Sequence, residues 1–131
     1  MADPRFRVLV VDNLSSVRNI ITNLLHEIGY PNTKQAEDGL QALIKLRIEQ
    51  FDLVIADSEM PVMDGLTLVQ EMRADKALAS VPILIVFAEA KKENIIAGIQ
   101  AGANGYIFKP FTAATLDEKI TKMLDHINRG G

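Results

Sequence analysis

Three ionisable side chains stand at the ends of short apolar runs, where the strands of a parallel sheet would finish. The runs and the residues that follow them are 6–11 before Asp12, 53–56 before Asp57, and 105–108 before Lys109. A short apolar run that stops at turn-forming residues indicates a buried strand. Open α/β sheets carry their chemistry at the carboxyl ends of the strands. We therefore expect the two acids and the lysine to converge at one edge of one sheet.

The rest of the chain alternates between strand and helix patterns. Strands are predicted at residues 6–11, 33–37, 53–57, 83–87 and 105–108. Apolar residues at helical spacing predict helices at 17–28, 40–46, 65–73, 91–101 and 112–127, and Asp38 is placed to cap the second. Such alternation requires a parallel sheet with right-handed crossovers and helices on both faces. The expected fold class is α/β, a doubly wound sheet of five strands and five helices.

Length and composition describe one folded domain over residues 1–131. The chain is 48% hydrophobic and 24% charged, as is ordinary for a globular domain. It has no cysteine, which excludes disulfides and thiolate metal sites, and its net charge of −3 argues against nucleic-acid binding. No apolar run is long enough to span a membrane, and the first residues lack the features of a signal peptide. We expect a cytoplasmic protein.

Four motifs make the chain similar to a known family. They are Val10-Val11-Asp12-Asn13, Ala36-Glu37-Asp38-Gly39-Leu40, Asp57-Ser58-Glu59-Met60-Pro61-Val62-Met63-Asp64-Gly65, and Lys109-Pro110-Phe111. In this order they resemble the receiver domain of two-component signalling. The stretches 88–96 and 109–116 narrow the resemblance to the single-domain response regulators of chemotaxis. The resemblance implies a flavodoxin-like strand order of 2-1-3-4-5.

The same resemblance implies a phosphoryl switch. Asp57 would accept a phosphoryl group from a histidine kinase in a phosphorelay, with Mg²⁺ beside it and Lys109 paired with the phosphoryl oxygens. The protein would be a signalling phosphoprotein. It would not be an enzyme, except that it would catalyse its own phosphorylation and dephosphorylation. Three plainer interpretations stay open: Asp12 could only cap the first helix, Asp57 could be an unreactive loop acid, and Lys109 could only face solvent.

Three residues depart from the family pattern around the implied metal site. Asn13 replaces a second acid that ligates the metal, and an amide oxygen brings no charge. Glu59 replaces an asparagine and is expected to supply part of the missing charge. The predicted metal ligands are therefore Asp12, Asn13, Asp57 and Glu59, with Mg²⁺ binding weakened but not abolished. Alternatively, Glu59 pairs with Lys109 and blocks the site. Ser58 replaces a bulky tryptophan and leaves the site more open.

Phe87 is a fourth departure, in the position where receivers carry a threonine or serine. That hydroxyl would bond a phosphoryl oxygen, which phenylalanine cannot do. The phenyl ring also needs the volume that Tyr106 would enter on activation, and an inserted ring costs about 1–3 kcal/mol in a packed interior. We therefore expect Tyr106 to stay outward and switching to be impaired. Phe87 could equally serve only to extend the apolar strand into the core.

A partner surface is implied around the last strand. It would carry Lys91, Lys92, Ile95, Tyr106, Phe108, Lys119 and Lys122. A basic rim around an exposed aromatic suits an acidic partner, and the resemblance names the histidine kinase and the flagellar motor switch protein or another signalling protein. The plainer interpretation is that these lysines only face water. We expect a monomer.

The expected function is a single-domain response regulator of the chemotaxis type, acting in flagellar motility. The alternative is a pseudo-receiver, an interaction module that works without phosphorylation. An enzyme such as a phosphatase or a flavin carrier is the weakest hypothesis, because the chain has no phosphate-binding Gly-rich loop and no tryptophan.

Overall fold

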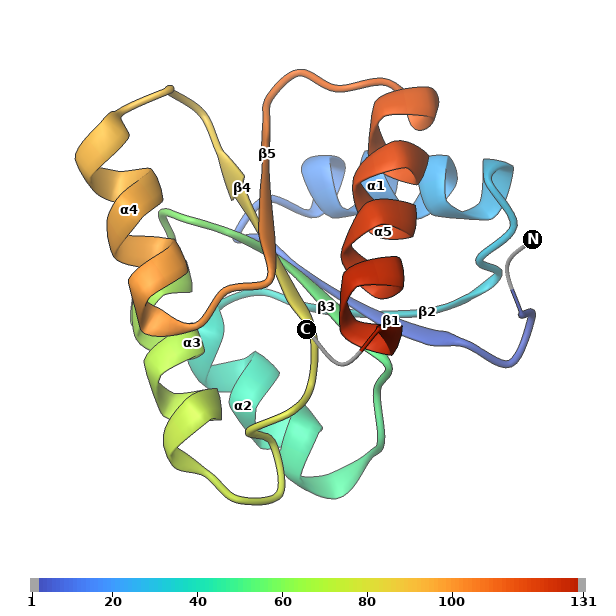
Figure 1. The fold of residues 1–131 in the computed structure, drawn as a ribbon. Helices are drawn as coiled ribbons and strands as arrows, with labels where there is room; N and C mark the ends of the chain where they lie inside the picture. Colours follow the sequence, from blue (N-terminus) through green and yellow to red (C-terminus); the bar gives the residue numbers. More distant parts are fainter. Residues whose placement is uncertain (1–2, 130–131) are drawn as a thin grey trace.

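The computed structural model describes residues 3–129 as one α/β layer structure. Its elements are β1 (Arg7–Val11), α1 (Ser15–Glu27), β2 (Asn32–Ala36), α2 (Gly39–Ile48), β3 (Leu53–Asp57), α3 (Gly65–Ala74), β4 (Ile83–Phe87), α4 (Lys92–Ala101), β5 (Gly105–Phe108) and α5 (Ala113–Asn128). The strands are parallel and lie in the order β2-β1-β3-β4-β5 (Figure 1). The predicted fold class and strand order are confirmed.

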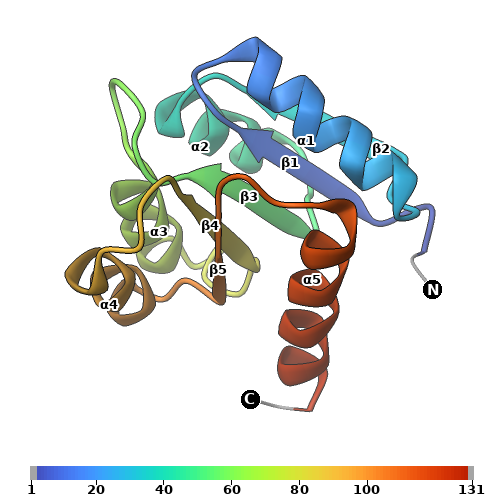
Figure 2. The same cartoon turned by 90° about the horizontal axis from the view of Figure 1, so that it is seen from above.

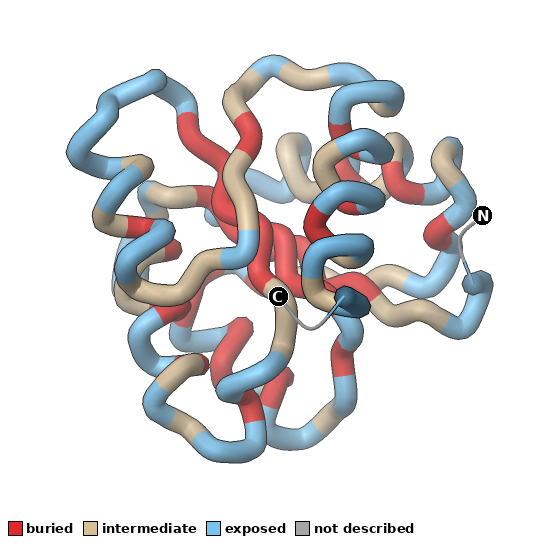
Figure 3. The backbone as a smooth tube through the Cα atoms, viewed as in Figure 1, coloured by how far each residue is buried: buried red, intermediate tan, exposed pale blue. Residues whose placement is uncertain are grey.

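Helices cover both faces of the sheet, as the crossovers require. Figure 2 shows α1 and α5 on one side and α2, α3 and α4 on the other. The two resulting cores share the sheet between them, because alternate residues of each strand point to opposite faces. Every residue of β3 and β4 is buried, and these strands form the red centre of Figure 3.

The helix starts follow local capping chemistry. Asp38 accepts a hydrogen bond from Gln41 N at the start of α2, as predicted, and Asp64 and Thr112 act likewise for α3 and α5. The second strand begins one residue earlier than predicted and is polar, and the strand order confirms that it lies at an edge. The first strand begins at Arg7 rather than Phe6, whose ring instead packs at 5.3 Å from that of Tyr30.

Parallel pairing brings the strand ends to a common edge. Val11 of β1 pairs with Ala56 of β3, and Asp57 pairs with Val86 of β4. Phe87 in turn pairs with Phe108 of β5. The residues that follow β1, β3 and β5 are therefore neighbours despite their distance in sequence. Within residues 3–129, no helix has the length and apolar character needed to cross a bilayer.

Candidate functional site

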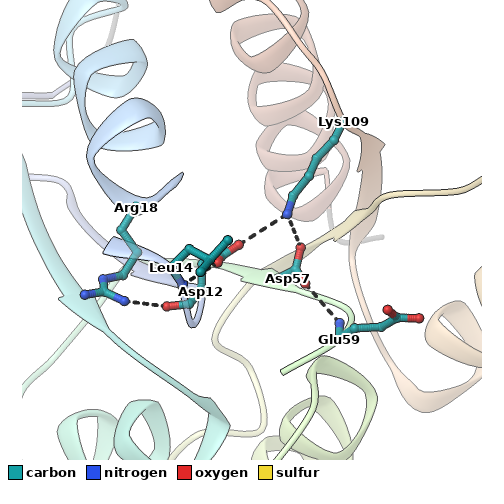
Figure 4. A network of polar contacts seen from close by, with 6 residues as sticks. All are labelled: Asp12, Leu14, Arg18, Asp57, Glu59 and Lys109. Carbon is teal, nitrogen blue, oxygen red and sulfur yellow. Dashed lines mark hydrogen bonds and ion pairs between the residues drawn. The ribbon is translucent and has the colours of Figure 1, made fainter. Parts of the chain in front are cut away.

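Two carboxylates and one ammonium meet at this edge. Lys109 Nζ lies 2.7 Å from Asp57 Oδ1 and 3.3 Å from Asp12 Oδ2 (Figure 4). Asp12 is 1% exposed and Asp57 is 8% exposed, although charged side chains rarely occupy such positions without partners. The structure thus brings together Asp12, Asp57 and Lys109. We call this trio the acid pocket.

Backbone donors fix both carboxylates. Leu14 N donates to Asp12 Oδ1 at 2.9 Å, and Glu59 N donates to Asp57 Oδ2 at 3.1 Å. Leu14, not Asp12, is the N-cap of α1. Asp12 therefore does more than a helix cap would: one oxygen orders the loop after β1 and the other faces the lysine.

Arg18 is a contributor that the sequence reasoning missed. Its guanidinium donates to the backbone oxygen of Asp12 at 2.6 Å (Figure 4). It also donates to Gln35 Oε1 at 3.0 Å. The contact ties the first turn of α1 and the edge strand β2 to the loop that carries Asp12. A basic residue in the first turn of the helix after a strand-end acid was the available signal, but sequence spacing does not show that its side chain turns back onto that loop.

The acid pocket carries one surplus negative charge, since two carboxylates share one ammonium. Burial raises the pKa of Asp57 above its ordinary value; Lys109 and the Glu59 N–H oppose that rise, and the charge of Asp12 adds to it. Burial alone would lower the pKa of Lys109, but Asp57 and Asp12 together outweigh burial and raise it. The two aspartates thus favour the cationic form of Lys109, whereas burial disfavours the ionised form of Asp57.

The donor set suits a divalent cation. Asp57 Oδ1 is buried, and its close cationic neighbour within the described chain is the Lys109 ammonium at 2.7 Å, which leaves a further lone pair of that oxygen free. It therefore retains acceptor capacity, and Mg²⁺ is commonly bound through one or two carboxylates with water. Asp12 and Asp57 fit that requirement.

The other two predicted metal ligands are placed less favourably. Asn13 is exposed, and the Glu59 carboxylate points away from the acid pocket (Figure 4). Residues 3–129 contain no cluster of three or more Asp, Glu, His or Cys arranged for a metal. Over the same residues Glu59 makes no ion pair with Lys109, whose partners are the two aspartates. Ser58 and Glu59 instead line an adjoining cavity of about 170 Å³.

An aromatic group occupies the neighbouring strand ends. Phe87 is 6% exposed and belongs to the core, in agreement with the plainer interpretation of this residue. Its ring centroid lies 6.3 Å from that of Phe108, which lies 5.6 Å from that of Tyr106. Lys119 Nζ sits 5.0 Å from the Tyr106 ring centroid. We call Phe87, Phe108 and Tyr106 the aromatic edge; it places no hydroxyl at the end of β4.

Some of the lysines on the predicted partner surface are already paired with acidic residues. Lys91 pairs with Glu89 and Lys122 with Glu118, both on the surface. Lys92 is exposed, whereas Ile95, Phe108 and Lys119 are half-buried. The structure places all of them around α4, β5 and α5, as the sequence suggested, with much of the basic charge locally compensated.

Curated relatives share this sequence over nearly its full length. The chain is 49% identical to chemotaxis protein CheY-3 of Vibrio cholerae over 121 residues, covering 92% of this chain and 93% of the relative. It is 47% identical to chemotaxis protein CheY of Pseudomonas aeruginosa over 122 residues, covering 93% and 98%.

Solved structures agree with the sequence relatives. The chemotaxis protein CheY4 of Vibrio cholerae matches with a TM-score of 0.84 and 34% identity, covering 90% of this chain and 98% of that one. The receiver domain of a sensor histidine kinase from Pseudomonas aeruginosa, described with a magnesium ion in its active-site cleft, matches with a TM-score of 0.78 and 30% identity, covering 86% and 92%. The family model of the response regulator receiver domain matches residues 8–121. The chain therefore belongs to the response regulator receiver domain family.

Proposed function

We propose that this chain, as one receiver domain over residues 1–131, is a cytoplasmic single-domain response regulator of the chemotaxis type. It accepts a phosphoryl group on Asp57 from a histidine kinase. The observation that carries the proposal is the buried Asp57 carboxylate, whose Oδ1 lies 2.7 Å from Lys109 Nζ, with Asp12 paired to the same ammonium. The similarity to chemotaxis proteins supports the pathway.

Each group in the acid pocket has a role in that reaction. An Asp57 carboxylate oxygen forms the bond to phosphorus while the bond from phosphorus to the donor nitrogen breaks, and the electron pair leaves with the donor. Lys109, held as a cation, neutralises charge on the transferred group from one side. Asp12 and Asp57 would hold Mg²⁺, which when bound neutralises charge on the same group. Arg18 positions Asp12 through its backbone oxygen.

Metal binding is weakened in this proposal, because Asn13 is neutral and Glu59 points away from the acid pocket. A Mg²⁺ titration of the parent and Glu59→Gln tests the contribution of Glu59. If the carboxylate swings in to share the ion, the variant binds Mg²⁺ more weakly. Equal or tighter binding in the variant would show that Glu59 does not replace the missing charge.

The output of the switch is impaired, and its targets are the flagellar motor switch protein or another signalling protein. The aromatic edge supports this part, because the Phe108 ring lies beside both the Phe87 ring and the Tyr106 ring. The same observation favours a second candidate function, a pseudo-receiver whose surface around α4, β5 and α5 binds partners without phosphorylation.

Labelling separates the two functions. The protein is incubated with phosphoramidate and Mg²⁺, and intact-mass spectrometry is used to detect a base-labile phosphoryl adduct. The response regulator requires an adduct that Asp57→Asn abolishes and Glu59→Gln retains. Absence of an adduct in the parent chain, with a related receiver labelled in parallel, would establish the pseudo-receiver instead.

A further inference from the structure

An apolar stripe runs along the outer face of α2. Leu40, Ile44 and Ile48 are 40%, 46% and 74% exposed and are spaced four residues apart, so they line up along one side of the helix. The opposite side of α2 is anchored by Ala42 and Leu43, both buried. We call Leu40, Ile44 and Ile48 the α2 stripe. No other element of the described chain covers it.

The charge around the α2 stripe differs from that of the rest of the molecule. The chain has a net charge of −3, and α1, α3, α4 and α5 each contain acidic residues. Helix α2 contains none, and its last turn carries Lys45 and Arg47. Arg47 lies 3.4 Å from Asp75, whereas Lys45 makes no ion pair within residues 3–129. Glu49, directly after α2, pairs with Arg7 at 2.7 Å, so the uncompensated charge beside the α2 stripe is the ammonium of Lys45.

These features decide between two kinds of occupant. A second copy of the chain would bring Lys45 of both molecules together, with no acidic residue on either α2 to offset the two charges. An amphipathic helix with aliphatic residues on one side and acidic residues at its margins fits both the stripe and the charge.

We propose that the α2 stripe is a docking site for an acidic amphipathic helix of a partner protein, independent of the phosphoryl site. Helix α3 packs between α2 and α4, so the stripe is separate from the surface around α4, β5 and α5 (Figure 2). The receiver can therefore hold two partners at once, one on each surface.

Chemical-shift mapping of the full ¹⁵N-labelled chain tests the proposal. The probes are two synthetic helical peptides with the same leucine pattern, one with glutamates at the margins and one with lysines. The acidic peptide should perturb residues of α2 and bind more tightly than the basic one. Ile44→Gln should weaken it about tenfold, as expected for one aliphatic side chain removed from the interface. Ile99→Gln on α4, equally exposed at 46%, is the matched control and should leave binding unchanged.

Reversal of charge provides a second arm that does not depend on the apolar contact. The double variant Lys45→Glu, Arg47→Glu should exchange the preference and favour the basic peptide. Thermal unfolding of each variant verifies that the fold is retained; if Ile44→Gln fails to fold, Leu40→Gln replaces it. Perturbations confined to α4 and α5, equal binding of both peptides, or no binding would overturn the proposal. So would a dimer in sedimentation velocity that Ile44→Gln dissociates, since the occupant would then be a second copy.

Discussion

The acid pocket and the aromatic edge are adjacent at the same edge of the sheet and are built by opposite physics. In the pocket, Asp12 and Asp57 are almost fully buried and share one ammonium. At the aromatic edge, Phe87 and its neighbours pack as an ordinary apolar core. Burial of surplus charge destabilises the folded state, whereas burial of aromatic rings stabilises it.

The contrast separates the residues that would carry out phosphoryl transfer from those that would relay it to the partner surface. The groups that would take part in phosphoryl transfer lie at the carboxyl ends of β1, β3 and β5, and they are retained at a cost to stability. The side chains that would relay phosphorylation to the output surface lie on β4 and β5, and their packing stabilises the fold. A receiver can therefore keep its reactive pocket while the path to its output surface is filled.

The largest effect should come from opening the aromatic edge. We expect Phe87→Thr to lower the free energy of unfolding by about 3 kcal/mol, because it empties a core position. The same change makes room beside Phe108, whose ring lies next to that of Tyr106, and places a hydroxyl at the end of β4. With beryllofluoride and Mg²⁺ as phosphoryl mimic, Tyr106 ring resonances should shift in the variant and remain in place in the parent.

Phe51→Thr is the matched control, since Phe51 is 7% exposed and Phe87 is 6% exposed. It should cost similar stability in urea unfolding without changing the response of Tyr106. A shift of Tyr106 in the parent chain as large as in Phe87→Thr would show that the aromatic edge does not restrain the switch.

The next effect concerns the only cation of the acid pocket. Lys109→Met leaves two buried carboxylates facing each other, and we expect unfolding free energy to fall by about 2 kcal/mol, less than for a fully buried pair because the lysine is partly exposed. The loss should shrink as the pH falls and Asp57 takes up a proton, because its pKa is already raised. Urea titrations at several pH values measure this. Lys122 forms an ion pair on the surface, and Lys122→Met should change the unfolding free energy by less than about 0.5 kcal/mol. Equal effects of the two variants would contradict the claim that Lys109 stabilises two buried carboxylates.

Removal of the surplus charge should have the opposite sign. The raised pKa of Asp57 means that its ionised form is less favourable in the folded chain than in the unfolded one. That penalty is absent below the ordinary pKa and complete above the raised one. Asp57→Asn should therefore stabilise the chain by about 1 kcal/mol at pH 7 and confer no gain below about pH 3.9. Thermal unfolding across pH checks the sign, and a loss at pH 7 would refute the argument.

The same division explains what the sequence could predict. Apolar runs and helical spacing predicted the sheet, its helices and the meeting of Asp12, Asp57 and Lys109, because strand ends share an edge in a parallel sheet. The orientation of Glu59 was not predictable, since an exposed loop side chain has no pattern to fix it. Nor was the contact of Arg18 with the Asp12 backbone, which depends on tertiary packing.

The smallest predicted effect lies in the loop beside the acid pocket. Val62 has a φ of 69°, and Met63 N donates to Pro61 O across it at 2.7 Å. This hydrogen bond across a residue with positive φ is that of a γ-turn, and positive φ is a genuine outlier for a β-branched residue. Val62 is also 77% exposed. The loop, like the pocket that it borders, thus holds an unfavourable arrangement.

Val62→Asn should relieve that strain and raise the unfolding free energy by somewhat less than about 1 kcal/mol, because asparagine tolerates left-handed backbone and the side chain loses no packing. Val62→Ala is the control at the same position, since alanine remains strained there and should gain less. Urea midpoints of the three proteins give the order. Phosphoramidate labelling should be unchanged in both variants, because Val62 contributes no group to the acid pocket. If asparagine and alanine gave equal midpoints, the strain would lie in the branched side chain rather than in the backbone.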